Sequence, residues 1–209
     1  MPPIRQDPAY HGFADRRTII GVTNFWNVVS NLPFLVVALW GWRGAATAER
    51  RIFLIGVAGV TFGSGWYHAH PDNATLFWDR LPMTVAFMAL FAEVIGKRVS
   101  SRTGRRLLIP LLVFGVASVI YWRYTDDLRF YVLVQFFPLL ALLLLLDGRR
   151  DPLLSLIGLY AFAKLLEWQD HAIAAVVSTG GHPWKHLAAS AAVFAYVACD
   201  SHPCKGKER

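Results

Sequence analysis

Seven long apolar segments follow one another along this chain, separated by short polar loops. They are residues 21–42, 52–69, 75–96, 107–122, 128–146, 152–176 and 183–199. Several approach the roughly 20 residues that a helix needs to cross a bilayer. Tilt or helical flanks could extend the short segments 107–122 and 183–199. The sequence therefore predicts an all-α, polytopic membrane protein with seven transmembrane helices.

Composition supports a single membrane domain. Of the 209 residues, 55% are hydrophobic and only 17% are charged, and a soluble domain of this length would carry more charge. No polar stretch is long enough to form a soluble module, so residues 1–209 are expected to be one domain. Residues 1–20 would be a polar N-terminal segment, and residues 200–209 a cytoplasmic tail.

The distribution of basic residues predicts the orientation. The net charge is +7, but the basic residues cluster in short loops, which favours a membrane protein over a nucleic-acid partner. The loops 43–51, 97–106 and 149–150, with the tail, hold roughly twice as many Lys and Arg residues as the opposite side. The N-terminus is therefore expected outside and the C-terminus in the cytoplasm. The oligomeric state is left open.

With that topology, the polar groups that are most out of place in apolar segments collect near the outer face. Ser64 and His68 end the second segment, and Asp79 lies near the start of the third. His182 and His186 begin the seventh. Ionisable groups at membrane depth are costly and usually functional, so this layer is the candidate site.

These residues suit metal-dependent hydrolysis. His182 and His186 are four residues apart and share a helix face, as do Ser64 and His68. Three imidazoles with one open position are typical of catalytic zinc, whereas calcium and magnesium prefer oxygen ligands. Zinc would lower the pKa of its bound water to about 7. Asp79 is the best-placed base, and the Ser64 hydroxyl could donate to an oxyanion.

Other polar residues near this layer allow more than one interpretation. Glu167, Asp170 and His171 could orient the ligands, or they could pair among themselves or with Lys164. Taken alone, His68 could be an interfacial polar residue. Asp79 taken alone could cap a helix ahead of Pro82.

Two features of the first and second segments bear on packing. Asn27, Ser30 and Asn31 are unusual at such depth, and they could hydrogen-bond across helices or line a cavity. Gly59 and Gly63 would let the second helix approach a neighbour closely.

The combination of these motifs resembles the alkaline ceramidase family, within a wider superfamily of seven-helix hydrolases that includes adiponectin-receptor-like proteins. The resemblance rests on Ser64-x-x-x-His68, Asp79-x-Leu81-Pro82-Met83 and His182-x-x-x-His186, with Phe25 to Leu32 in the first segment. The stretch from Glu167 to Ala189 is similar to short bacterial members.

The resemblance implies a zinc-dependent amidase that cleaves the N-acyl bond of ceramide-like lipids within the membrane. It implies that His68, His182 and His186 bind zinc, while Asp79 and Ser64 assist the water and the oxyanion. Eukaryotic members carry an acidic, calcium-associated cluster ahead of the first helix. Here Asp15 stands nearly alone and Asn24 replaces an expected acidic residue, so calcium is not expected.

Three rival hypotheses remain. The chain could hydrolyse another acyl lipid, or it could be a non-catalytic lipid receptor with a structural zinc. A third class is a transporter that uses its histidines as a proton or metal relay. It predicts polar residues that continue to the opposite face, where Glu93 is the only strong candidate. Small size and short loops suit a bacterial inner membrane, with the site near the periplasmic face and a lipid substrate drawn from the bilayer.

Overall fold

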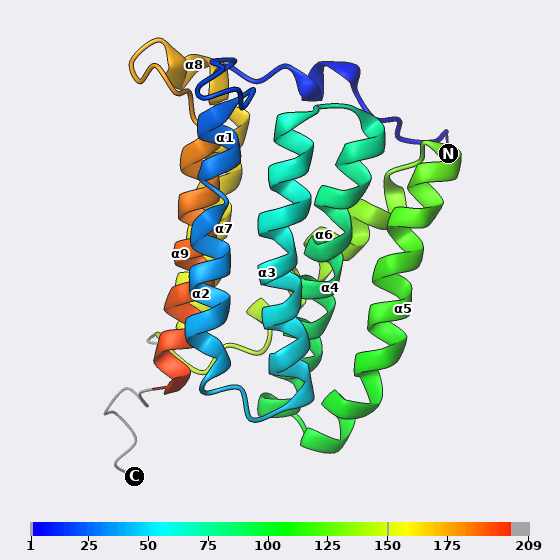
Figure 1. Cartoon of the computed structure of the whole chain (residues 1–209). Helices are drawn as coiled ribbons and strands as arrows, with labels where there is room; N and C mark the ends of the chain where they lie inside the picture. Colours follow the sequence, from blue (N-terminus) through cyan, green and yellow to red (C-terminus); the bar gives the residue numbers. More distant parts are fainter. Residues whose placement is uncertain (1, 150, 202–209) are drawn as a thin grey trace.

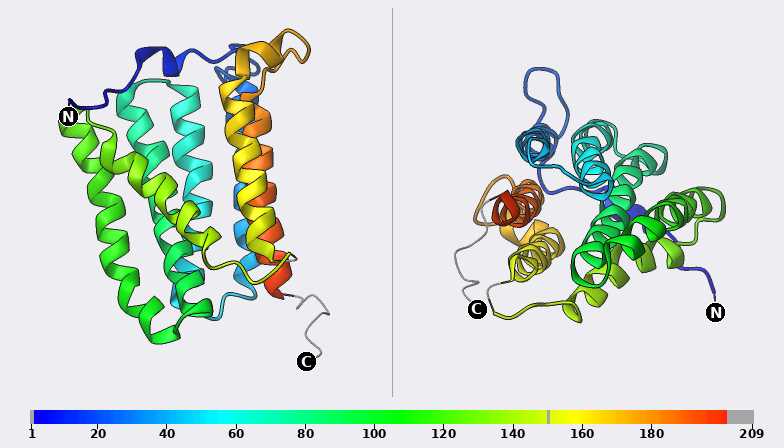
Figure 2. Two further views of the ribbon diagram at one scale, coloured as in Figure 1. Left: turned by 180° about the vertical axis from the view of Figure 1, so that it is seen from behind. Right: turned by 90° about the horizontal axis from the view of Figure 1, so that it is seen from below.

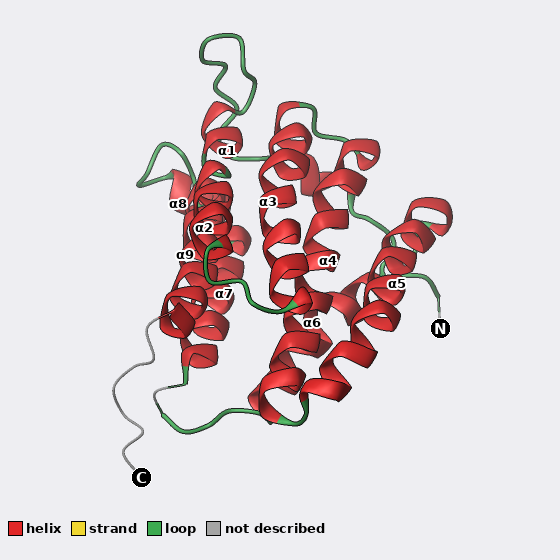
Figure 3. Ribbon diagram, turned by 60° about the horizontal axis from the view of Figure 1, so that its bottom comes forward, coloured by secondary structure: helices red, strands yellow, loops and turns green. Residues whose placement is uncertain are grey.

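The computed structural model describes residues 2–149 and 151–201. Within that part, the chain folds into helices and forms no named strand, and one isolated bridge joins Ile19 to Val22 (Figure 3). The predicted all-α class is therefore confirmed. The expected tail, residues 200–209, lies almost entirely outside the described residues.

The helices follow the seven apolar segments, with two breaks. Their bounds are η1 Pro8–His11, α1 Phe25–Val29, α2 Leu32–Trp42, α3 Ala48–Ala69, α4 Asn73–Arg98, α5 Ser101–Thr125, α6 Arg129–Leu143, α7 Pro152–Trp168, α8 Asp170–Ala174 and α9 His182–Ser201. The first segment breaks between α1 and α2, where Pro33 cannot donate the hydrogen bond that would continue α1. The sixth segment breaks between α7 and α8. The fourth is longer than its apolar core, because α5 has 25 residues.

Among the residues that the structure describes, three stretches are long and apolar enough to cross a membrane: Phe25–Trp42, which joins α1 and α2, together with α3 and α5. Helix α6 is apolar but only 15 residues long. Large apolar side chains are exposed on α2, α5 and α6, including Val36, Val113 and Leu140. An outer surface of this kind suits contact with lipid.

The long helices run side by side and form a bundle (Figure 1). Seen along their axes, α2, α7 and α9 form one group, and α3 to α6 form another (Figure 2, right). Because successive helices alternate in direction, the ends of α3 and α7 and the beginnings of α4 and α9 meet at one end of the bundle. This places the candidate residues together, as the sequence predicts.

Helices α3 and α4 approach each other closely along a line of small residues. A side-chain carbon at Gly63 would lie 2.0 Å from the carbonyl oxygen of Trp78, and one at Gly59 would lie 2.9 Å from Pro82. Pro82 has no N–H to donate to the Trp78 carbonyl, so that oxygen is free to face Gly63. The predicted close approach at Gly59 and Gly63 is confirmed, and it sets Ser64 against Asp79.

The N-terminal segment lies across the same end of the bundle (Figure 1). Two aspartates in the loop between α5 and α6 hold its beginning: Asp127 accepts from the Ile4 N–H at 3.3 Å, and Asp126 accepts from the Gln6 N–H at 3.2 Å. Phe13 and Asp15 are buried further along the segment. This segment, residues 2–17, therefore lies over the end where the candidate residues meet, and we call it the N-terminal cover.

Candidate metal centre

Three histidines meet beneath the N-terminal cover. His68 lies in the last turn of α3, while His182 and His186 form the first two turns of α9. Each can offer one ring nitrogen such that all three atoms lie within 4.8 Å of one another. Their exposed fractions are 1%, 4% and 5%. Three imidazoles buried this close together form a set that can hold one metal ion.

The start of α9 is fixed by a tight turn against the end of α7. Gly180 has a φ of +69°, a conformation that glycine adopts at little cost. A side-chain carbon at Gly181 would lie 2.2 Å from the carbonyl oxygen of Leu166. The Asp170 carboxylate accepts from the His182 N–H at 2.9 Å and from the Ala14 N–H at 3.0 Å. Asp170 thereby satisfies a free N–H at the beginning of the helix and ties it to the N-terminal cover.

The hydrogen bonds of the site leave one ring nitrogen of each histidine able to bind a metal ion. Ser30 Oγ lies 2.8 Å from Nδ1 of His186 and also donates to the Asn27 carbonyl. Ser30 therefore accepts from Nδ1–H, which leaves Nε2 of His186 with its lone pair. Nδ1 of His68 and Nε2 of His182 are buried without a hydrogen-bond partner. Buried unpartnered nitrogens are costly, and a metal ion would satisfy them, so the residues fit zinc.

Ser64 and Asp79 lie beside this cluster. Ser64 is one helical turn before His68 on α3, and its hydroxyl is close enough to hydrogen-bond with the Asp79 carboxylate. Both side chains are buried. The N-cap of α4 is Asp72, so Asp79 lies well inside the helix. The alternative interpretation of Asp79 as a helix cap is therefore wrong.

A cavity of about 260 Å³ runs from these residues into the bundle. One end is polar, and its walls include Ser64, Asp79, Arg80, Glu167, Lys185 and His186. The rest is apolar, lined by residues such as Phe53, Val57, Leu90, Leu139, Leu156 and Val193. Its shape and chemistry suit a lipid with a polar group at the histidine end and a hydrocarbon chain in the bundle.

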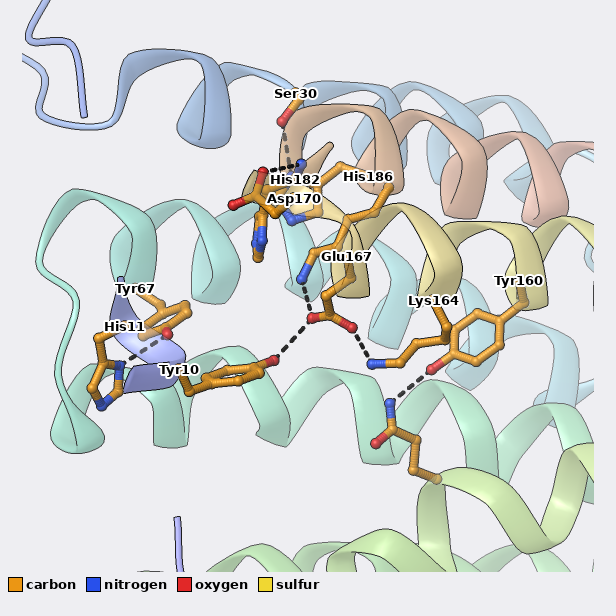
Figure 4. A network of polar contacts seen from close by, with 12 residues as sticks. Tyr10, His11, Ser30, Tyr67, Tyr160, Lys164, Glu167, Asp170, His182 and His186 are labelled. Carbon is orange, nitrogen blue, oxygen red and sulfur yellow. Dashed lines mark hydrogen bonds and ion pairs between the residues drawn. The ribbon is translucent and has the colours of Figure 1, made fainter. Parts of the chain in front are cut away.

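Glu167 belongs to an ion-pair network beside the cavity, at a distance from the histidine rings (Figure 4). It accepts from Lys185 at 2.6 Å and from the Tyr10 hydroxyl at 3.0 Å, and it also pairs with Lys164. Desolvation of the Tyr10 phenol, aided by the Glu167 carboxylate, raises the pKa of Tyr10 well above its usual value. The phenol therefore stays protonated and remains a donor. The ion pair with Lys164 agrees with the second of the two interpretations that the sequence allows for Glu167.

His171 is placed on the surface and contacts the N-terminal cover. Its Nε2 lies 2.8 Å from the carbonyl oxygen of Gly12. The structure thus gives this histidine a contact with Gly12, while the neighbouring Asp170 bonds to the backbone of His182.

Two residues that contact the histidines were not identified from the sequence as part of the site. The Phe13 ring lies 4.7 Å from that of His68 and 4.6 Å from that of His182, measured between centroids. The sequence predicts that Ser30 hydrogen-bonds across helices or lines a cavity; the structure shows the first of these, with His186 of α9 as a partner that the sequence does not specify. A polar side chain in an apolar helix was the signal for Ser30, whereas Phe13 gave none.

Three buried histidines, a neighbouring carboxylate and an apolar cavity are features of a hydrolase that acts on lipids. The comparison with protein families agrees: the ceramidase family model matches residues 18–149, and the chain belongs to that family. This confirms the resemblance to alkaline ceramidases and supports a ceramide-hydrolysing function. The matched part contains Ser64, His68 and Asp79 and ends before α7 and α9. A search of curated proteins gives no match.

Proposed function

We propose that this protein is an intramembrane zinc-dependent amidase that cleaves the N-acyl bond of ceramide-like lipids. The observation that carries the proposal is the position of the buried His68, His182 and His186 cluster next to Ser64 and Asp79, at the polar end of a largely apolar cavity. Membership of the ceramidase family supports the same reaction.

Zinc held by the three histidines would supply an activated water and polarise the amide carbonyl. In the reaction, the water oxygen adds to the acyl carbon and the C–N bond breaks. The fatty acid leaves as a carboxylate, and the amine nitrogen takes up both protons of the water and leaves as an ammonium group. Asp79 would accept a proton from the water and pass it to the leaving amine. The Ser64 hydroxyl is in position to donate to the developing oxyanion.

The lining of the cavity supports one orientation of the substrate. The acyl chain would lie in the apolar part among Phe53, Leu90 and Leu139, and the amine portion would lie at the polar end near Lys185. The N-terminal cover, with Phe13 against the histidine rings, would keep bulk water from the reacting atoms. Exclusion of water strengthens each polar interaction inside the site.

Seven crossings remain part of this proposal. α1 and α2 would form the first span, and α3, α4, α5, α6, α7 and α9 would form the others. The distribution of basic residues favours an N-terminus outside and a C-terminus inside. In a bacterial inner membrane, the histidine end would then lie near the periplasmic face, where substrate enters from the bilayer.

The test measures zinc and turnover together. Purified protein in detergent should contain about one zinc per chain and release fatty acid from ceramide. His68→Ala, His182→Ala and His186→Ala should each lose zinc and reduce turnover to background. His70→Ala is the matched control, because His70 is exposed at the same end of α3. Normal zinc content in all three ligand variants would contradict the proposal.

A further inference from the structure

Arg80 is a buried cation at the polar end of the cavity, and the proposed reaction does not use it. Its exposed fraction is 5%, and it lines the cavity together with Asp79. Asp79 and Arg80 are consecutive residues in α4, so their side chains leave the helix in different directions. An arginine keeps its charge under all ordinary conditions. Arg80 therefore brings a fixed positive charge to the wall of the substrate cavity.

The partners of Arg80 are neutral. Nη2 donates to Oε1 of Gln6 at 2.5 Å, while Nη1 is buried without a hydrogen-bond partner. The guanidinium carbon lies 4.1 Å from the Trp122 ring centroid and 4.6 Å from that of Tyr131. Among the side chains that the structure describes, none provides a carboxylate that pairs with Arg80. The rings and Gln6 hold the guanidinium in place and leave one of its donors unused.

The same end of the cavity carries more positive than negative charge. Its described lining includes the cations Arg80, Lys164 and Lys185, but only two carboxylates, Asp79 and Glu167. Glu167 is shared between the two lysines. Zinc on the histidines would add to this excess. The Asp79 carboxylate acts on Arg80 through space, without a direct ion pair. A buried charge that lacks a direct counter-charge is costly, and burial at membrane depth usually marks a functional group.

We propose that Arg80 binds an anionic group on the amine portion of the substrate. This inference rests on the proposed amidase function and deepens it. The substrates favoured would be N-acyl lipids whose amine portion carries a carboxylate, phosphate or sulfonate. The planar guanidinium suits such groups because it can donate two parallel hydrogen bonds to two of their oxygens. Lys185 would contribute to the same positive field.

The test compares two amides with the same acyl chain. N-oleoylglycine carries a carboxylate on the amine side, whereas N-oleoylethanolamine is neutral there. In detergent micelles, wild-type kcat/KM should be at least about tenfold higher for the anionic amide, since a hydrogen bond to a charged group contributes roughly 1.5–3 kcal/mol. Equal values, or a preference for the neutral amide, would overturn the assignment without any variant being made.

Arg80→Gln then tests the residue itself. It removes the charge while keeping a polar side chain, and it should lower kcat/KM for N-oleoylglycine by about tenfold or more. The value for N-oleoylethanolamine should change by less than about twofold. Arg80→Lys should be intermediate, because lysine lacks the planar fork. Zinc content and the melting temperature in detergent show whether each variant is folded. An equal loss for both amides would make Arg80 structural and contradict the inference.

Arg98→Gln is the matched control. Arg98 pairs with Asp151 at 2.7 Å at the opposite end of the bundle, so its loss should leave the preference unchanged.

Inhibition by sodium oleate tests a second source of the anion, which is the carboxylate of the released fatty acid. If Arg80→Gln weakens inhibition by oleate as strongly as it lowers N-oleoylglycine turnover, Arg80 binds the product, and the inference is wrong.

The outcomes also separate this inference from the proposed function. If zinc is present but ceramide and both amides remain intact, the amidase proposal itself is wrong. If the neutral lipids are hydrolysed without any preference for the anionic amide, the amidase proposal stands and only the role of Arg80 is lost.

Discussion

Helix α4 carries a buried carboxylate near each of its ends, and the two differ in their partners: Glu93 is held in ion pairs, whereas Asp79 is not. At the far end, Glu93 pairs with Arg50 at 2.8 Å and with Lys97 at 2.7 Å. At the cover end, Asp79 is buried beside Ser64 and Arg80 lacks a carboxylate partner. Charges at the far end are thus matched within the protein.

This difference separates structural charges from functional ones. Arg50 and Glu93 join α3 to α4, so their pairing contributes to holding the helices together. Nδ1 of His68, Nε2 of His182 and Nη1 of Arg80 have no hydrogen-bond partner. A metal and a substrate would supply those partners. Oε2 of Glu93 also lacks a hydrogen bond, but the Glu93 carboxylate keeps its two ion pairs. Glu93 offers little support for a transporter relay, because its charge is already paired.

The strongest test replaces the carboxylate near each end of α4 with the corresponding amide, in two separate variants. Asp79→Asn removes the proposed base and should lower turnover of ceramide by about 10²–10⁴-fold, with zinc content retained. Glu93→Gln should leave turnover within about twofold and lower the melting temperature in detergent, because Arg50 loses its buried counter-charge. Metal analysis, fatty-acid release and thermal unfolding measure the three effects.

The reverse pattern would contradict this comparison of Asp79 with Glu93. If Asp79→Asn kept full turnover, or if Glu93→Gln lost it while remaining folded, then the matching of charge would not distinguish the two ends. The amide variants are chosen because they keep the size of each side chain, so any loss reports on charge and proton transfer.

Much of this arrangement could be predicted from the sequence. Helical spacing puts His182 and His186 on one face, and alternating helix direction brings them to the level of His68 and Asp79. Both follow from the helical repeat and from the order of the apolar segments, which can be read from the sequence. The small residues Gly59 and Gly63 likewise indicate close helix packing.

The features that the sequence did not reveal depend on contacts between parts of the chain that are far apart in the sequence. Phe13 lies in a segment without periodicity, and it reaches the histidines only because Asp126, Asp127 and Asp170 hold that segment across the bundle. Arg80 is not among the site residues that the sequence predicts. Its burial depends on aromatic rings from α5 and α6 that are about 40 residues or more away in the sequence.

A smaller effect is expected from Ser30, which orients a proposed ligand without touching the metal. Ser30→Ala removes the acceptor at 2.8 Å from Nδ1 of His186. Loss of such a partner typically weakens metal affinity by about 10–100-fold, measured here by competition with a zinc chelator. Ser190→Ala is the matched control on α9, since Ser190 is buried but bonds to the Leu187 carbonyl. Equal zinc affinities in the two variants would remove Ser30 from the site.

The smallest effect should come from a residue that lies at the cover end but is already satisfied. Asp72 caps α4 by accepting from the Thr75 N–H at 2.7 Å, which lowers the pKa of Asp72 below its ordinary value of 3.8. Asp72→Ala should lower the free energy of unfolding by about 1 kcal/mol and leave turnover at pH 7 within about twofold. Thermal unfolding and fatty-acid release measure the two quantities.

The pH dependence of stability gives the sign of the Asp72 contribution. Because the folded-state pKa is depressed, this contribution is fully present above pH 3.8 and is lost as the pH falls through the lower folded value. Asp72→Asn retains a capping oxygen but cannot titrate, so its melting temperature should fall less steeply than that of the wild type below pH 4. If Asp72→Ala instead abolished turnover while the protein stayed folded, the comparison would be wrong. Functional residues would then be identified by their place at the cover end and not by the absence of a partner.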